Sequence, residues 1–111
     1  MAENSDLEYK SKTDHAHMCG HDGHMTMLLT FASLIQKHLD SIPSNKLIRL
    51  IFQPAEEGPG GAPLMITDGC LEGINEIYGI HNWPLGHECS VSVKSGIQMA
   101  GGSKFVITVI G

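Results

Sequence analysis

The chain has 111 residues, of which 41% are hydrophobic and 17% are charged. This length predicts one domain at most, large enough to bury roughly two thirds of its unfolded surface. Seven basic residues against twelve acidic ones give a formal charge of -5, and no cluster of Lys and Arg is present to neutralise a phosphate backbone. We therefore expect no nucleic-acid partner.

Neither a membrane span nor a disulfide framework is expected. No apolar run approaches the ~20 residues that cross a bilayer, and residues 1–14 are polar. The three cysteines, Cys19, Cys70 and Cys89, are an odd number at unrelated spacings, which argues against structural disulfides. A cytoplasmic location with no membrane partner is the default expectation.

The first regular element that the sequence predicts is a helix. From Asp22 onward, apolar residues recur at intervals of three and four, which predicts a helix with one buried face; they are Met25, Leu28, Leu29, Ala32, Ile35 and Leu39. Pro43 and Ser44 are expected to end this helix. We expect Asp22 to cap its first turn, because a carboxylate there lies near free backbone amides.

Short apolar runs after this helix predict strands. Residues 47–52 form such a run, closed by Gln53 and Pro54, and are expected to be a buried strand. A helix over 62–71 and a strand over 76–80 follow, and the alternation at 91–93 and 105–109 predicts two more strands. Helices and strands in this order indicate an α/β fold. Residue 1 begins in a predicted loop and the last strand reaches residue 111, so we expect both ends to continue in a longer chain.

Cys19 and His21 form the first candidate metal-binding pair. They are two residues apart, so in an extended segment that leads into a helix they project to the same side. Thiolate and imidazole are good zinc ligands. From spacing alone, the alternative that Cys19 is a core thiol and His21 a solvated loop residue stays open.

Two adjacent carboxylates follow the first predicted strand. Glu56 and Glu57 lie at its carboxyl end, which is where α/β sheets bind ligands. Adjacent side chains diverge, so one carboxylate can bind metal while the other transfers protons in a metal-assisted hydrolysis. Two solvated glutamates in a surface turn are the alternative, and the position after an apolar strand favours function.

Two further histidines complete the candidate set. His81 ends the strand predicted over 76–80, where a metal ligand and a core histidine are both reasonable. His24 follows His21 by three residues on nearly the same helix face, so we expect it to contact substrate or to support a ligand. Because the candidates all lie where a regular element meets a loop, we predict that they converge on one site.

Cysteine-based hydrolysis is the competing chemistry, with Cys19 as nucleophile and His81 as base. Cys19 precedes the predicted helix by several residues instead of heading it. The nearby acidic pair would also raise the pKa of the Cys19 thiol unless a cation is present. Both points favour a metal site.

Three separated motifs carry a family resemblance. Residues 17–24 (His-Met-Cys-Gly-His-Asp-Gly-His), 52–58 (Phe-Gln-Pro-Ala-Glu-Glu-Gly) and 79–84 (Gly-Ile-His-Asn-Trp-Pro) resemble the aminoacylase, hippurate hydrolase and auxin-conjugate amidohydrolase branch of the dinuclear zinc carboxypeptidase-like metallopeptidase family. The resemblance implies a three-layer αβα sandwich with a mixed sheet, similar to the zinc exopeptidase catalytic domain but incomplete. Residues 1–111 would be the central portion of this domain, and the lid and dimerisation domain would be absent.

The resemblance also implies roles for individual residues. Cys19, His21, Glu57 and His81 match metal ligands, and Glu56 matches the general base, which takes a proton from the attacking water and returns it to the leaving amine. Asp22 and His24 are expected beside the substrate or behind the ligands. The implied cofactors are two divalent cations, zinc first, with manganese or cobalt as alternatives. The implied partner is a small N-acyl amino acid, cleaved at its amide bond, with a homodimer in a longer parent.

Departures from the family pattern keep a second hypothesis open. The family has an upstream aspartate that orients the base and a final metal-binding histidine far downstream, and neither has a counterpart here. Met18 also stands where alanine is usual. The alternative reading is a truncated, non-catalytic metal-binding or interaction fragment, whose unpaired sheet edges would favour association.

Overall fold

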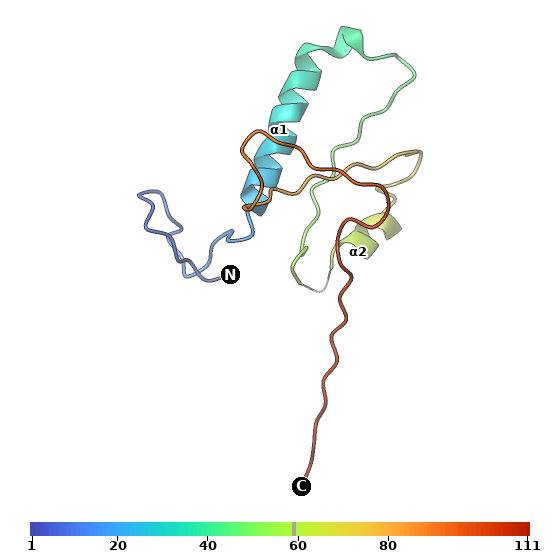
Figure 1. Cartoon of the computed structure of the whole chain (residues 1–111). Helices are drawn as coiled ribbons and strands as arrows, with labels where there is room; N and C mark the ends of the chain where they lie inside the picture. Colours follow the sequence, from blue (N-terminus) through green and yellow to red (C-terminus); the bar gives the residue numbers. More distant parts are fainter. Residues whose placement is uncertain (59) are drawn as a thin grey trace.

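A computed structural model describes residues 1–58 and 60–111. In chain order it contains helix α1 (His21–Lys37), a 3-10 turn η1 (Leu39–Ser41) and a short helix α2 (Ala62–Thr67) (Figure 1). Loops and extended segments make up the rest of the described chain. Within these residues no strand is formed, and the only β-type pairing is an isolated antiparallel bridge between Ala2 and His15.

Helix α1 confirms the predicted helix but corrects its cap and its end. It ends at Lys37, several residues before Pro43, and Leu39 belongs to the separate turn η1. Gly20, with φ 77°, is the residue that caps the helix, and no side chain caps its first turn. Because glycine adopts positive φ without steric cost, the chain turns at Gly20 and the helix begins before Asp22. The Asp22 carboxylate instead accepts a hydrogen bond from the Gly23 backbone N–H at 2.9 Å, within the first turn, where negative charge is favourable.

One face of α1 is half-buried, although no residue of α1 is buried. Apart from Gly23, the half-buried residues recur at helical spacing and are His21, His24, Leu28, Ala32 and Ile35. The expectation of a buried apolar face was wrong in degree, since no second layer of described residues covers it. In the first turn of α1 this face carries the imidazoles of His21 and His24, so the helix positions these two side chains in the site.

The predicted strands do not form ladders among the described residues. Segments 47–52, 76–80, 91–93 and 105–109 carry no strand pairing. A strand forms only when its backbone hydrogen-bonds to a second segment of chain. The apolar pattern of one segment does not supply that partner. The three-layer sandwich is therefore not present in the part of the chain that the structure describes.

Helix α2 is shorter than the predicted helix over 62–71. It ends at Thr67, and Gly69 follows with φ 83°, a left-handed residue typical of helix ends. The turn beyond it is tied to segment 47–52 by Arg49, whose Nη1 donates to the backbone oxygens of Gly69, Cys70 and Glu72 at 3.2, 2.8 and 3.1 Å. Charge-assisted hydrogen bonds of this kind hold two remote segments together.

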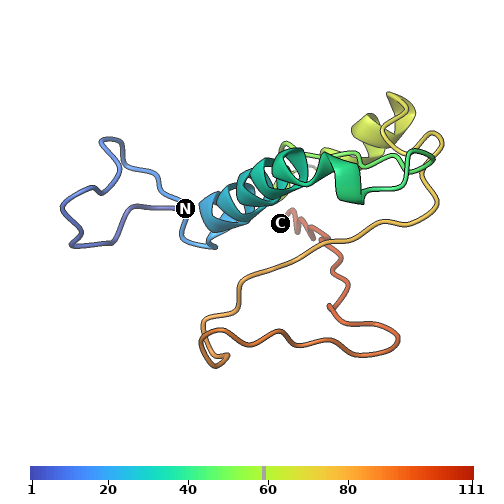
Figure 2. The same cartoon turned by 90° about the horizontal axis from the view of Figure 1, so that it is seen from above.

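The chain as a whole is open. Its radius of gyration is 18.4 Å, against about 13 Å for a compact domain of this length. None of the described hydrophobic side chains is buried. Residues 105–111 run away from the rest of the chain (Figure 1), and the loop around residues 80–100 lies to one side of α1 (Figure 2). Among the described residues, no helix has the length and apolar character required to cross a membrane.

Candidate metal centre

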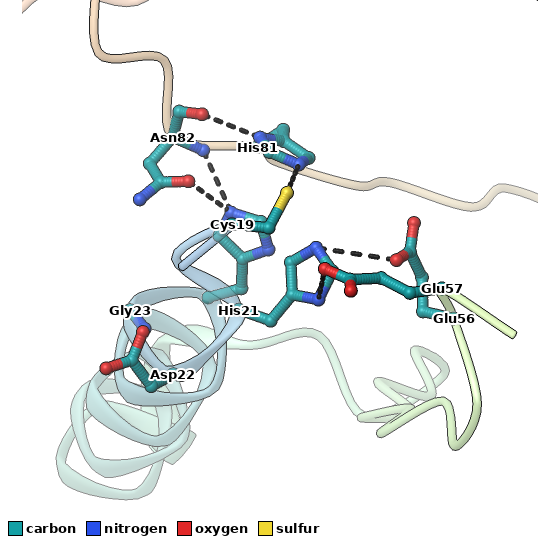
Figure 3. Close-up of polar contacts among 9 residues, drawn as sticks. Cys19, His21, Asp22, Gly23, Glu56, Glu57, His81 and Asn82 are labelled. Carbon is teal, nitrogen blue, oxygen red and sulfur yellow. Dashed lines mark hydrogen bonds and ion pairs between the residues drawn. The ribbon is translucent and has the colours of Figure 1, made fainter. Parts of the chain in front are cut away.

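Three segments that are remote in sequence bring polar side chains together (Figure 3). Cys19 and His21 lie where the chain enters α1. The acidic pair follows segment 47–52, and His81 lies on the loop that crosses the start of α1. The structure thus brings together the Cys, His and Glu residues that the sequence singled out.

The first ligand group contains one thiol and two imidazoles. Cys19 Sγ lies 3.9 Å from His81 Nε2. One ligand atom each from Cys19, His21 and His81 can be chosen such that all lie within 4.8 Å of one another. This set of sulfur and nitrogen donors is the chemistry that zinc prefers.

The second ligand group has His21 between two carboxylates. Glu56 Oε2 lies 3.4 Å from Nε2 of the ring and Glu57 Oε1 lies 3.6 Å from Nδ1. His21 is only 21% exposed, whereas the glutamates are 53% and 43% exposed. Because His21 belongs to both groups, the two groups form one continuous cluster of five ligand-type side chains. Its donors fit divalent cations, since each group supplies three ligand atoms within reach of one ion.

A strained turn presents the acidic pair. Ala55 has φ 52°, a left-handed conformation that costs a non-glycine residue roughly 1–2 kcal/mol. Its carbonyl oxygen accepts hydrogen bonds from the N–H groups of Gly58 and Gly60 at 3.3 and 3.2 Å. The turn therefore projects Glu56 and Glu57 toward His21, and such strain is commonly found at functional sites.

The electrostatics of the cluster bear on Cys19. Burial, and then the negative charges of Glu57 and Glu56, raise the pKa of the Cys19 thiol. Both causes disfavour the thiolate. A bound cation would offset this repulsion and favour the thiolate form.

His24 differs from the ligand-type residues. Its Nε2 lies 2.7 Å from Asn82 Oδ1 and 3.0 Å from the Asn82 backbone nitrogen. When protonated, this nitrogen donates to Oδ1, and when unprotonated it accepts from the backbone N–H. Its ring centroid is 4.3 Å from that of His81. Since Asn82 already occupies Nε2, His24 is suited to support His81 and not to bind an ion through that nitrogen. The sequence analysis missed Asn82, although it directly follows His81.

Asp22 lies apart from the cluster. Its carboxylate is exposed and hydrogen-bonds to the backbone of its own helix, and Figure 3 shows it away from the labelled Cys, His and Glu side chains. In this structure Asp22 therefore acts on the first turn of α1. Its expected position beside substrate or behind a ligand stays a prediction.

A cavity of about 890 Å³ opens beside the cluster. Its lining includes His21, both glutamates, His81 and the apolar side chains of Leu28 and Phe52. A few convergent polar groups in a largely apolar hollow of this size are typical of small-molecule sites.

The site is a candidate centre for divalent cations, and comparison with known proteins names the family of the chain. Residues 1–104 match the family described as Peptidase family M20/M25/M40. The chain belongs to this family. Membership implies a zinc exopeptidase-like α/β domain and dependence on divalent metal.

Curated relatives agree with this assignment. The chain is 44% identical to hippurate hydrolase of Campylobacter jejuni, over 100% of this chain and 29% of the relative. It is 40% identical to IAA-amino acid hydrolase ILR1-like 5 of Arabidopsis thaliana, over 94% of this chain and 24% of the relative. It is 45% identical to thermostable carboxypeptidase 1 of Saccharolobus solfataricus, over 100% and 28%. The chain thus spans 24–29% of these relatives' length, and no solved structure matches it.

Proposed function

We propose that the protein takes part in metal-dependent hydrolysis of the amide bond of N-acyl amino acids or related amides. The observation that carries this proposal is the continuous cluster in which His21 lies between Cys19 and His81 on one side and the two glutamates on the other. Relatives named as hydrolases of hippurate and of amino-acid conjugates support the choice of bond.

The proposed ligands are Cys19, His21, Glu57 and His81, and the proposed cofactor is a pair of divalent cations. Cations bound there would polarise the scissile carbonyl and acidify a water molecule. We propose zinc as the metal, because thiolate and imidazole donors favour it. Cobalt and manganese are the alternatives, and the carboxylates also accept manganese.

Glu56 is proposed as the general base. Its carboxylate accepts a proton from the attacking water, holds it on one oxygen, and delivers it to the nitrogen of the leaving amine. Glu56 lies beside Nε2 of His21, whereas Glu57 lies beside Nδ1. The two adjacent glutamates can therefore have separate roles. Glu56 is also the more exposed of the two, which leaves it room to reach a substrate in the cavity.

Substitution of the two glutamates tests these roles. Glu56→Gln should lower kcat about 100-fold to 10000-fold, which is the usual contribution of a general base, while bound metal stays unchanged. Glu57→Gln should lower bound metal and activity together. Turnover of an N-acyl amino acid and metal content, measured on each purified variant, check both statements. Glu88→Gln, an exposed glutamate outside the cavity lining, is the matched control, and retained turnover in Glu56→Gln would falsify the assigned base.

A cysteine hydrolase is the second candidate, because the 3.9 Å separation of Cys19 Sγ and His81 Nε2 suits a nucleophile and its base. The raised pKa of the Cys19 thiol opposes it. Chelation separates the two candidates: EDTA abolishes metal-dependent turnover and leaves cysteine-dependent turnover intact.

The remaining parts of the proposal concern the whole protein. Residues 1–111 are proposed as the central portion of an αβα sandwich, with a small-molecule substrate, a homodimeric parent and a cytoplasmic location. The three free cysteines agree with a reducing compartment. A non-catalytic interaction fragment is the remaining alternative, favoured by the many exposed apolar side chains.

A further inference from the structure

We infer that Asn82 is a positioning residue that sets the separation of the Cys19 and His81 ligands by fastening the His81 loop to the start of α1. The inference rests on the proposed function, because it concerns the same metal-binding cluster. It assigns a role to a residue that the sequence motifs did not explain.

The first step is the contact between the loop and helix α1. Asn82 and His24 are 58 positions apart, and His24 Nε2 lies 2.7 Å from Asn82 Oδ1 and 3.0 Å from the Asn82 backbone nitrogen. In either tautomer of His24 one of these contacts is a hydrogen bond, to Oδ1 when Nε2 is protonated and from the N–H when it is not. His24 is fixed by the helix that also carries His21. Asn82 is therefore held in a set position relative to the first turn of α1.

The second step is the orientation of His81. The His81 Nδ1–H donates to the backbone oxygen of Asn82 at 2.6 Å. A proton held on Nδ1 leaves Nε2 free as an electron-pair donor. That nitrogen is the one directed at Cys19 Sγ, 3.9 Å away. The backbone oxygen of Asn82 thus favours the His81 tautomer that can bind an ion together with Cys19, and the Asn82 side chain holds this part of the loop at α1 (Figure 3).

The third step is the fit of Asn82 against Gly20. A Cβ atom added at Gly20 would lie 2.2 Å from Asn82 Nδ2 and 2.9 Å from Oδ1, which is closer than real Cβ contacts allow. A side chain at Gly20 is therefore disfavoured for two reasons: its φ of 77°, and this close approach, which would displace the Asn82 side-chain amide. Asn82 thus lies against Gly20, the residue that directly follows Cys19 in the chain.

The test measures zinc affinity and the His81 tautomer in the protein and its variants. Asn82→Ala removes the side-chain contact, and we expect zinc affinity to fall about 10-fold to 100-fold, the usual cost of losing a group that orients a ligand. Asn82→Asp keeps the size and the Oδ1 acceptor, so it should retain most of the affinity. In metal-free protein, 15N NMR should show the Nδ1–H tautomer of His81. Asn82→Ala keeps the backbone oxygen that accepts this proton, so the tautomer should stay the same in that variant, and the loss of affinity should come from the position of the loop alone.

Glycine variants supply a matched pair. Gly20→Ala combines strain at positive φ with the collision at Asn82, whereas Gly73→Ala has a similar φ of 72° and open space around it. Only Gly20→Ala should weaken zinc binding. In the double variant Gly20→Ala/Asn82→Ala the collision is gone. Its loss of zinc affinity should therefore be smaller than the sum of the two single losses and close to the larger of them. Circular dichroism of α1 checks that each variant keeps its helix.

The outcomes separate this inference from the proposed function. Unchanged zinc affinity in Asn82→Ala would overturn the positioning role and leave the metal site intact. Absence of zinc binding by the unmodified protein would overturn the metal site, and the His81 tautomer of the unmodified protein would still decide whether the Asn82 backbone oxygen orients His81.

Discussion

At the scale of single residues, the candidate site depends on His21. Its two ring nitrogens face different carboxylates, and its ring also lies 5.8 Å from that of His81. An imidazole can serve two neighbours because its nitrogens point in different directions. His21 therefore connects the two ligand groups into one cluster.

The sequence indicated the residues with ligand chemistry, but not the residue that we propose to position them. Cys19, His21, Glu57 and His81 carry side chains whose chemistry is recognisable in any context, and the structure gathers them. Asn82 has no such chemical signature, and its role follows from contacts with Gly20 and His24 that only a folded chain creates. Asp22 resembled a helix cap, but the backbone freedom of Gly20 decided where α1 begins.

Glu3 gives a prediction about pH. Its carboxylate accepts hydrogen bonds from the Ser5 N–H and hydroxyl at 2.8 and 2.7 Å and from the Ser11 N–H at 2.9 Å. These bonds, with the Ser5 hydroxyl contributing most, lower the pKa of Glu3 from 4.5 to about 2. The folded pKa is depressed, so the stability that this contact gives the N-terminal loop is present above pH 4.5 and is lost as pH falls toward 2.

Substitution of the two serines separates their contributions. Ser5→Ala should raise the Glu3 pKa toward 4.5, because the hydroxyl donor is removed. Ser11→Ala should leave it unchanged, since Ser11 donates through its backbone. An NMR titration of the Glu3 carboxyl carbon measures both, and a Glu3 pKa near 2 in Ser5→Ala would contradict the assigned cause.

At the scale of elements, α1 was predictable and the strands were not. The spacing from Met25 to Ile35 is a local signal, because each turn of a helix hydrogen-bonds within itself. A strand is completed by a partner that is remote in sequence, so segments such as 47–52 and 105–109 carry the composition of strands without forming them here. The family to which the chain belongs supports the α/β class, and the sandwich itself stays a proposal.

The approach of α2 to the acidic turn gives a prediction at this scale. A Cβ at Gly61, which is buried, would lie 2.1 Å from the backbone oxygen of Pro54. Gly61→Ala should therefore displace the turn that carries the acidic pair. Strain of about 1–3 kcal/mol is typical of overpacking, and strain of this size, transmitted to the acidic pair, would weaken zinc binding roughly 5-fold to 150-fold.

Gly79→Ala is the matched control for this substitution, because a Cβ at Gly79 would meet nothing within 4 Å. Isothermal titration with zinc compares the two variants. Equal affinities would show that the close packing of Gly61 against Pro54 does not position the acidic pair.

At the scale of the whole molecule, exposed apolar segments dominate. Phe105, Ile107 and Ile110 are 82%, 78% and 90% exposed, in a run rich in β-branched residues and poor in charge. Extended segments of this kind pair with other chains when nothing covers them. The sequence predicted these segments as parts of a sheet, and the open structure shows that the described residues do not cover them.

Self-association of the 111-residue chain is the corresponding prediction. At micromolar concentration it should elute in size-exclusion chromatography well above its mass of 12.0 kDa. Ile107→Lys should shift elution toward the monomer, because a charge within the run opposes pairing. Ser95→Lys adds the same charge at another exposed position and should change little. Monomeric elution of the unmodified chain would contradict the prediction.

The central claim is that Cys19, the histidines and the glutamates together hold divalent cations on which amide hydrolysis depends. Cobalt substitution tests it most directly, since a cobalt–thiolate bond gives a charge-transfer absorption. When metal-stripped protein is titrated with Co²⁺, this absorption and the hydrolysis of an N-acyl amino acid should rise together, and both should be absent in Cys19→Ser. Hydrolysis that survives metal removal, or an absorption that persists in Cys19→Ser, would contradict the account.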